Sequence, residues 1–214
     1  MTDHCTQDPP ATETELTGHK WLDRITREPE HSHWYAQRWK DFVAEGKDID
    51  GEARFVDTLA PRKARVFDAG SGTGRVGGYL LSRGHSVVGV DIDPYLVSVA
   101  KKDHPDGEWF VGELASFDLA AHTSTNFDVI VSTGNVISLL REQDRVHAFK
   151  RFADYLAPEG RMILGFAAGR GYEFADFFAD LGAAGLERTA TFSTWDMRPF
   201  TEDSDFVVAL IQKA

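Results

Sequence analysis

The chain has 214 residues, of which 42% are hydrophobic and 27% are charged, so it has the composition of a globular protein and the length of one domain. Its 34 acidic residues outnumber its 23 lysines and arginines, which gives a formal net charge of -11. That charge repels polyphosphates at long range, so nucleic acid is an unfavourable partner. With Cys5 as its single cysteine the chain forms no internal disulfide, and no apolar run is long enough to span a membrane. These features fit a cytoplasmic protein without a membrane anchor.

The N-terminal part of the chain divides into a tail and two helices. Residues 1–18 are polar and acidic, contain two prolines and lack apolar periodicity, so they are predicted to be a flexible tail. Apolar residues then recur at near-helical spacing over His33–Ala44 and Glu52–Leu59. We therefore expect a single domain over residues 19–214, in which the helices of residues 19–62 form a cap on a core of residues 63–214.

From residue 64 onward, short β-rich runs alternate with helical stretches. The strands are expected at 64–68, 85–90, 108–111, 127–131 and 161–166, and the helices between them at 75–83, after Pro94 and at 142–156. This alternation is typical of parallel βαβ units. A further helix at 172–181 precedes two runs, 186–193 and 205–212, that are joined by a loop too short for a parallel crossover. The sequence thus predicts an α/β fold with a seven-stranded, mostly parallel sheet and an antiparallel last strand.

A glycine-rich turn follows the first of these strands. In Val66–Arg75 it places Gly70, Gly72 and Gly74 where the strand ends and a helix begins. Glycine permits positive φ and close approach of a ligand to the backbone. The free N–H groups at a helix N-terminus attract an anionic group. The turn therefore predicts a ligand site, but it does not by itself identify the ligand.

Two ligand classes are compatible with the turn. Gly72, Gly74 and Gly77 match the G-x-G-x-x-G spacing of dinucleotide-binding proteins, and Asp91 lies at the distance of a ribose-binding acid. Asp68, however, comes directly before the turn, where its charge opposes a pyrophosphate and suits the ammonium of an amino acid. Asp91 can accept hydrogen bonds from both hydroxyls of a ribose. These acids favour an amino-acid nucleoside over NAD.

At this point the chain resembles the class I S-adenosylmethionine-dependent methyltransferases, whose first motif is similar to residues 67–74. The resemblance implies a Rossmann-like three-layer sandwich, S-adenosyl-L-methionine (SAM) as cofactor and S-adenosyl-L-homocysteine (SAH) as product. It also implies that the methionyl part is held by Asp68 and by the turn of Gly70, Ser71, Gly72, Thr73 and Gly74, with Asp91 on the ribose and Ile92 on the adenine. Glu113 and Leu114 are similar to the family's adenine-edge loop, in which aspartate is usual. The segment Ser132, Thr133, Gly134 and Asn135, after the fourth strand, is expected to open towards cofactor and substrate.

The acceptor is narrowed by motifs that the sequence lacks. No Pro-Pro-aromatic segment follows the fourth strand, no cysteine nucleophile lies in the core, and no carboxylates follow the fourth and fifth strands. We therefore expect no metal, and direct in-line transfer of methyl to a small-molecule acceptor. A methyltransferase-fold binding or scaffold protein that has lost transfer is the main alternative, and an NAD(P)-dependent oxidoreductase is a further one.

Several residues outside the motifs have two interpretations. Trp34, Tyr35 and Arg38 either cover the cofactor or form an ordinary core-and-surface pattern on their helix. His147 is either a general base or a solvated helix residue. Arg198, in the loop before the last strand, either orients an acidic acceptor or belongs to hairpin packing. His147 and Arg198 are the candidates for catalytic roles, and the sequence indicates no oligomeric state.

Overall fold

The computed structural model describes residues 16–214; the first fifteen residues of the predicted tail, with Cys5, lie outside this range. Thr17 and Gly18, which the sequence assigned to the tail, bind the first helix instead. Their backbone N–H groups donate to the Asp23 carboxylate at 2.7 and 3.1 Å. These two exposed residues are therefore held at the start of α1 by hydrogen bonds. No helix within residues 16–214 has both the length and the apolar character needed to cross a bilayer.

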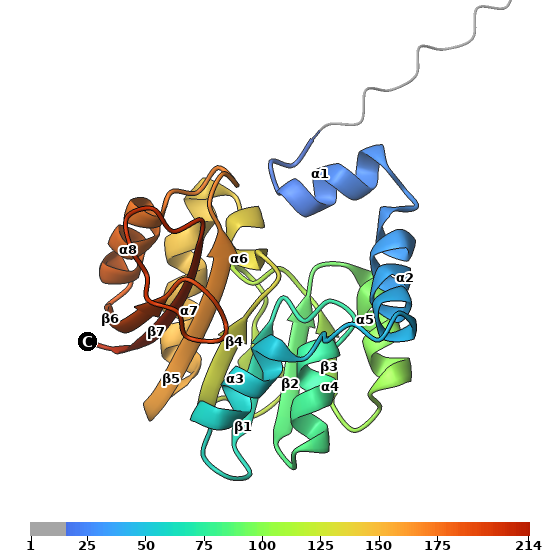
Figure 1. The fold of residues 1–214 in the computed structure, drawn as a ribbon, viewed down its shortest axis with the longest axis horizontal. Helices are drawn as coiled ribbons and strands as arrows, with labels where there is room; N and C mark the ends of the chain where they lie inside the picture. The colour runs from blue at the N-terminus through green and yellow to red at the C-terminus, as the bar shows by residue number, and fades with distance from the viewer. Residues whose placement is uncertain (1–15) are drawn as a thin grey trace, which may run out of the picture.

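In the described chain, seven strands form one sheet in the order β3-β2-β1-β4-β5-β7-β6 (Figure 1). Strands β1 to β5 are parallel to one another, and β7 is antiparallel to both β5 and β6. The predicted mostly parallel sheet with an antiparallel last strand is confirmed. The strands are β1 (Arg65–Ala69), β2 (Ser86–Asp91), β3 (Glu108–Val111), β4 (Phe127–Ser132), β5 (Leu156–Ala167), β6 (Leu186–Phe192) and β7 (Phe206–Lys213).

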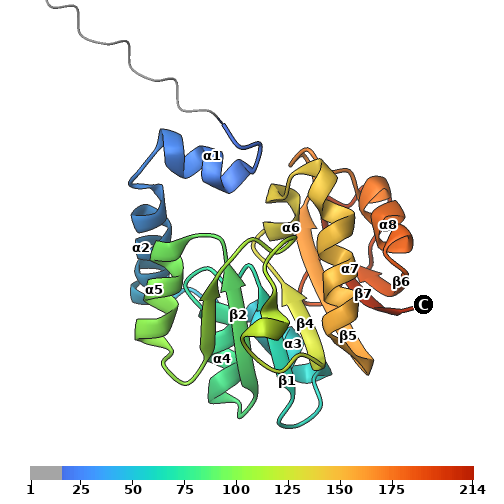
Figure 2. The same cartoon turned by 180° about the vertical axis from the view of Figure 1, so that it is seen from behind.

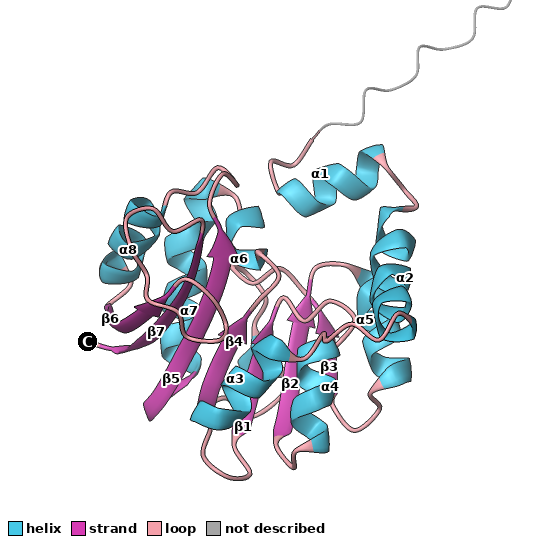
Figure 3. Ribbon diagram, in the orientation of Figure 1, coloured by secondary structure: helices cyan, strands magenta, loops and turns pink. Residues whose placement is uncertain are grey.

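Helices cover both faces of the sheet, which makes the three layers of a Rossmann-like fold (Figures 2 and 3). Neighbouring strand residues point to opposite faces: Val66 belongs to the core cluster under α3, α4 and α5, and Phe67 to the cluster under α7 and α8. Because both faces are covered, the central strands β1, β2 and β4 are mostly apolar and buried. The helices are α1 (Lys20–Arg27), α2 (His31–Ala44), α3 (Gly51–Leu59), α4 (Arg75–Ser82), α5 (Pro94–Asp103), α6 (Val136–Leu139), α7 (Arg145–Tyr155) and α8 (Phe174–Ala183).

The helix α3 corrects one sequence expectation, because it does not belong to a cap. Its residues Ala53, Phe55 and Val56 are buried in the core cluster that also contains Val66 and Val129 of the sheet. The helix is therefore part of a sheet-covering layer. Helix α1 lies beyond the carboxyl ends of the strands, and α2 lies beside α5 (Figure 1).

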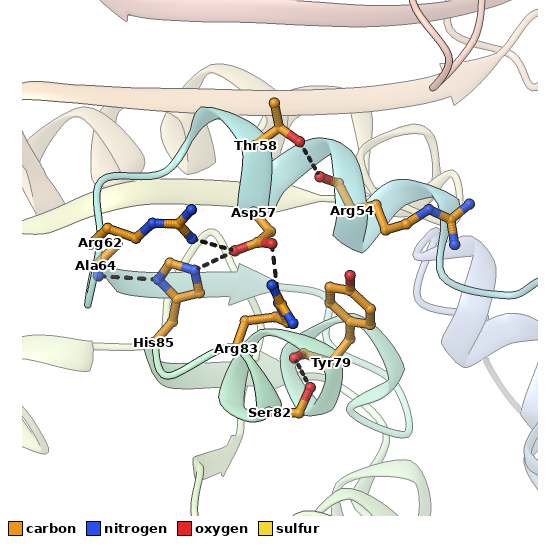
Figure 4. Close-up of polar contacts among 9 residues, drawn as sticks. All are labelled: Arg54, Asp57, Thr58, Arg62, Ala64, Tyr79, Ser82, Arg83 and His85. Atoms are coloured by element: carbon orange, nitrogen blue, oxygen red, sulfur yellow. Dashed lines mark hydrogen bonds and ion pairs between the residues drawn. The ribbon is translucent and has the colours of Figure 1, made fainter.

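Polar contacts join α3 to the segment that precedes β2 (Figure 4). This segment lies at the amino ends of the strands, whereas α1 lies at their carboxyl ends (Figure 1). His85, just before β2, accepts a hydrogen bond at Nδ1 from the Ala64 N–H at 3.1 Å. The ring proton therefore lies on Nε2, which is 3.0 Å from the Asp57 carboxylate of α3 and donates to it. Arg83 lies 3.3 Å from the same carboxylate, and these hydrogen bonds hold the pKa of Asp57 below its ordinary value.

Two short helices were not predicted. Helix α1 has only eight residues, none of them fully buried, and this is shorter than the stretch of about 11–18 residues over which helical periodicity is recognised. Helix α6 has four residues and starts after Asn135, whose φ of 68° is left-handed. Both elements depend on contacts with distant parts of the chain, and both lie at the functional site.

Candidate active site

The main pocket lies at the carboxyl ends of β1, β2 and β4. In the sheet, β2 and β3 lie on one side of β1, and β4 lies on its other side. The strand order therefore reverses between β1 and β4. Ligands of open α/β sheets bind at such a point. The pocket contains about 570 Å³ of empty space, including the open solvent at its mouth, and a deeper extension reaches Asp68 under the glycine turn.

The glycine turn forms the floor shared by the pocket and its extension. Gly70 has φ +82°, and a Cβ there would lie 2.3 Å from the Val136 side chain. Gly74, with φ +75°, is the N-cap of α4. Gly70 and Gly72 line both compartments, whereas Ser71 and Thr73 line only the deeper one. The turn thus brings the predicted methionyl-binding residues to one end of the pocket.

Asp68 lies in the deeper extension and is 1% exposed. It accepts a hydrogen bond from the Gly77 N–H at 3.1 Å. Burial raises the pKa of Asp68 to about 7, because desolvation penalises the ionised carboxylate. A cation placed beside it would restore the charged form, as the ammonium of an amino acid would.

Asp91 ends β2 on the wider side of the pocket. Its carboxylate accepts hydrogen bonds from the Gly72 N–H at 2.8 Å and the Asp93 N–H at 2.9 Å. Burial also raises the pKa of Asp91, to about 6. Ile92 and Leu96 line the wall beside it, so the carboxylate is flanked by apolar side chains that suit a flat base.

The residues of the loops after β3 and β4 contribute unequally to the lining of the pocket and its deeper extension. Leu114 lines the pocket, but Glu113 forms an ion pair with Arg141 at 2.6 Å. Thr133 lines the deeper extension, and Gly134 lines both compartments. The remaining two residues of the predicted segment support the backbone: Ser132 Oγ donates to the Ala69 carbonyl at 2.7 Å, and Asn135 Oδ1 accepts from the Ala167 N–H at 2.8 Å.

Of the three aromatic and cationic residues considered on α2, only Tyr35 lies in the site, where it lines both compartments. Trp34 is 54% exposed, and Arg38 is an exposed residue whose guanidinium lies 5.0 Å from the Phe42 ring centroid. The cationic side chain that lines the deeper extension belongs to Arg75 and not to Arg38. Its place directly after the glycine turn was the signal that could have identified it.

The two candidates for catalytic roles lie outside both compartments. His147 is an exposed residue of α7, in agreement with its interpretation as a solvated helix residue. Arg198 has a side chain that is 74% exposed and lies 3.5 Å from Asp196. Its loop folds towards α3, where Trp195 contacts Phe55 with ring centroids 5.8 Å apart. The structure brings neither residue to the pocket.

The mouth of the pocket is lined by residues that the sequence did not single out. Helix α1 contributes Trp21, and His19 immediately precedes it. Trp21 Nε1 donates to Asp93 Oδ2 at 2.9 Å, and Ser32 of α2 donates to the same oxygen. The other Asp93 oxygen caps α5 by accepting from the N–H groups of Tyr95 and Leu96. Asp93 therefore docks both cap helices next to Asp91.

These features define the class of the protein. An acid next to the end of β1, an acid at the end of β2 and a glycine turn at a strand-order reversal form a site for a nucleoside that carries an amino-acid or phosphate group. The buried Asp68 carboxylate fits the amino-acid group. Among residues 16–214, no group of three or more potential metal ligands comes together.

Comparison with known proteins also indicates a protein that binds an amino-acid nucleoside, a SAM-dependent methyltransferase. Residues 66–160 match the methyltransferase domain family. A crystal structure of a TehB-like SAM-dependent methyltransferase from Corynebacterium glutamicum is 46% identical, with a TM-score of 0.83, and the match covers 87% of this chain and 100% of that one.

Two curated proteins are more distant. An uncharacterized methyltransferase of Oceanobacillus iheyensis is 30% identical over 61% of this chain and 62% of its own length. A dTDP-3-amino-3,4,6-trideoxy-α-D-glucopyranose N,N-dimethyltransferase of Streptomyces venezuelae is 25% identical over 69% of this chain and 57% of its own. The chain thus matches about three fifths of the length of these curated relatives.

The chain belongs to the SAM-dependent methyltransferases of class I. This membership confirms the prediction of SAM as cofactor, with SAH as product, and it excludes the oxidoreductase interpretation of the glycine spacing.

Proposed function

We propose that this protein transfers the methyl group of SAM directly to a small-molecule acceptor. The observation that carries the proposal is the enclosure of the pocket mouth by α1 and α2. His19, Trp21 and Tyr35 line it from the cap, and Leu139 and Leu140 line it from the region after β4. A concave, mostly apolar site with a few polar groups is typical of small-molecule recognition.

Two further observations support a small acceptor. The net charge of -11 disfavours a polyanionic substrate. The Streptomyces venezuelae relative is named for methylation of an amino group on a nucleotide-linked sugar. A small molecule with a nucleophilic nitrogen or oxygen is therefore the acceptor that we propose, in a cytoplasmic enzyme.

The residues divide between binding and chemistry. Asp68 would hold the ammonium of the methionyl part, Asp91 the ribose hydroxyls, and Ile92 and Leu96 the adenine. When bound, the sulfonium supplies an activated methyl group. The protein then has to align the acceptor with the methyl carbon and sulfur and to exclude water.

The first test is calorimetric titration with SAM, SAH and NAD in separate experiments. We expect micromolar binding of SAM and SAH and none of NAD. Asp91→Ala should weaken SAM binding by at least tenfold, whereas Asp154→Ala, at an exposed position on α7, should not change it. Native affinity in the Asp91 variant would reject the ribose assignment.

The second test is SAH release in the presence of a panel of small amines, phenols and amino sugars, with tRNA as a separate arm. Turnover with a small molecule supports the proposal. Turnover with tRNA alone would reject the small-molecule acceptor, and SAM binding without any turnover would favour the scaffold alternative.

A further inference from the structure

We infer that His19 is the residue that receives the proton of the methyl acceptor. The inference rests on the proposed transfer to a small molecule and adds a catalytic residue to it. Neither the pattern of motifs nor the family match assigns a role to this position, which precedes the matched residues 66–160.

His19 occupies an unusual position for a polar side chain at the start of a helix. It is the N-cap of α1, but its side chain makes no capping hydrogen bond. Instead, the residue is only 5% exposed and lines the main pocket. Its Nδ1 is buried without a hydrogen-bond partner among residues 16–214. An unpaired buried polar atom costs about 1–3 kcal/mol, so such an atom at a pocket wall points to a partner supplied by a ligand.

The segment that carries His19 is held at both sides of the pocket mouth. Lys20 Nζ donates to the Ser138 carbonyl of α6 at 2.8 Å and also to the Arg170 carbonyl after β5. On the other side, Trp21 donates to Asp93. The α1 segment therefore spans the pocket from the β5 side to the β2 side (Figure 1), and it holds His19 in the wall of the pocket.

The charged groups around His19 come from four elements. Glu113 after β3, Asp23 of α1 and Asp144 before α7 favour the protonated ring, whereas Arg141 after α6 opposes it. Burial is the largest effect, and it lowers the pKa of His19 below its ordinary value. The ring is therefore neutral near pH 7 and able to accept a proton.

The methyl transfer in which His19 takes up the proton is balanced without any other reactant. The lone pair of the acceptor N or O forms the bond to the methyl carbon as the carbon–sulfur bond breaks, and its electrons stay on sulfur as SAH. The proton of the acceptor moves to the unprotonated nitrogen of the neutral His19 ring and then to solvent. Asp68 and Asp91 are assigned to the cofactor, which leaves His19 as a basic group at the mouth.

The test compares His19→Gln and His19→Asn with His122→Gln, an exposed histidine outside the pocket. The forward assay measures SAH release with the small-molecule acceptor that gives turnover, beginning with the dTDP-amino sugar of the Streptomyces venezuelae relative. The reverse assay measures SAM formed from SAH and methyl iodide, in which iodide leaves and no proton moves. Calorimetry measures SAM affinity of each variant.

We expect both His19 variants to bind SAM within about threefold of the wild type and to keep the methyl iodide reaction. Forward turnover should fall by about 100-fold or more, and the acidic limb of the pH profile of kcat/KM for the acceptor, measured at saturating SAM, should disappear. Retained forward turnover with an unchanged pH profile would overturn the role of His19 and would leave the proposed function intact. A tenfold loss of SAM affinity would make His19 a cofactor ligand and also overturn it, whereas no turnover of any small molecule by the wild type would overturn the proposed function itself.

Discussion

Asp68 shows how a single residue of the site links ligand binding to pH. Its pKa is about 7 in the ligand-free protein because the carboxylate is fully buried. A raised pKa means that the folded state retains a proton that the unfolded state loses at lower pH. The fold is therefore favoured at low pH, and this contribution is lost as pH rises through the folded pKa. A bound ammonium would reverse the shift by stabilising the ionised form.

We therefore predict that SAM affinity increases from pH 5.5 to pH 8 and that binding releases protons. Asp91 contributes in the same direction, since its pKa is about 6. Calorimetry in two buffers with different ionisation enthalpies measures the proton release. Asp68→Asn should bind SAM more weakly and lose most of the pH dependence. An affinity that is flat over this range in the wild type would contradict the assignment of Asp68.

Gly70 and Gly72 provide a second prediction at the residue scale. Gly70→Ala combines a left-handed φ with a Cβ that would lie 2.3 Å from Val136, whereas a Cβ at Gly72 would come no closer than 3.7 Å to Tyr35. We expect Gly70→Ala to lower the free energy of unfolding by about 3 kcal/mol, from left-handed strain and overpacking, and Gly72→Ala by about 1 kcal/mol from the strain alone.

Urea denaturation of the two glycine variants measures these losses. The double variant Gly70→Ala/Val136→Ala should recover part of the loss, because the smaller side chain makes room for the new Cβ. Equal losses in the two single variants, or no recovery in the double variant, would show that contact with Val136 does not determine the need for glycine.

Among the elements, α3 depends on a small polar cluster as well as on its apolar face. Asp57 accepts a hydrogen bond from Nε2 of His85, and Nδ1 of the same ring accepts one from the Ala64 backbone. This chain of contacts joins α3 to the amino ends of β1 and β2. The contacts need the ionised carboxylate, because the depressed pKa of Asp57 shows that the charged form is the stabilised one.

We predict that Asp57→Asn lowers the free energy of unfolding at pH 7 by about 1–3 kcal/mol. Because the folded pKa of Asp57 is depressed, its contribution is present above about pH 4 and is lost as pH falls through the folded pKa. The stability curves of variant and wild type should therefore converge in acid. Asp48→Asn, which breaks an exposed ion pair with Arg54, should change the urea midpoint little. A constant difference at all pH values would contradict the electrostatic explanation.

At the scale of the whole molecule, the cofactor pocket joins parts of the chain that are far apart in sequence. It is lined by residues from before α1, from α2, from the ends of β1 and β2, and from the loops after β3 and β4. A ligand that binds only the folded state stabilises all of these contacts together.

We predict that SAM at 100 times its dissociation constant stabilises the fold by about 2.7 kcal/mol, which raises the Tm by roughly 5–10 °C for a domain of this size. NAD at the same concentration should not change the Tm. Scanning fluorimetry at pH 6 and pH 8 provides the measurement, with a larger SAM shift expected at pH 8. A shift with NAD alone would be incompatible with the assigned ligand.

The sequence determined the layered α/β fold, the succession of its seven strands and of its longer helices along the chain, and the cofactor-binding turn. Those features are encoded locally: the strands by their apolar runs, the turn by Gly70 to Gly74, and the ligand by the acids Asp68 and Asp91 in the last positions of two strands. The antiparallel β7 also followed from the length of a single loop.

Only the tertiary structure decided which side chains meet at the pocket. It placed α3 in a sheet layer, turned Arg38 to the surface and directed Arg75 to the deeper extension, because helical spacing alone does not show which face of a helix is covered. It also brought His19 to the mouth through hydrogen bonds from Lys20 to α6 and from Trp21 to Asp93. Those contacts join residues separated by 118 and 72 positions, so no local pattern records them.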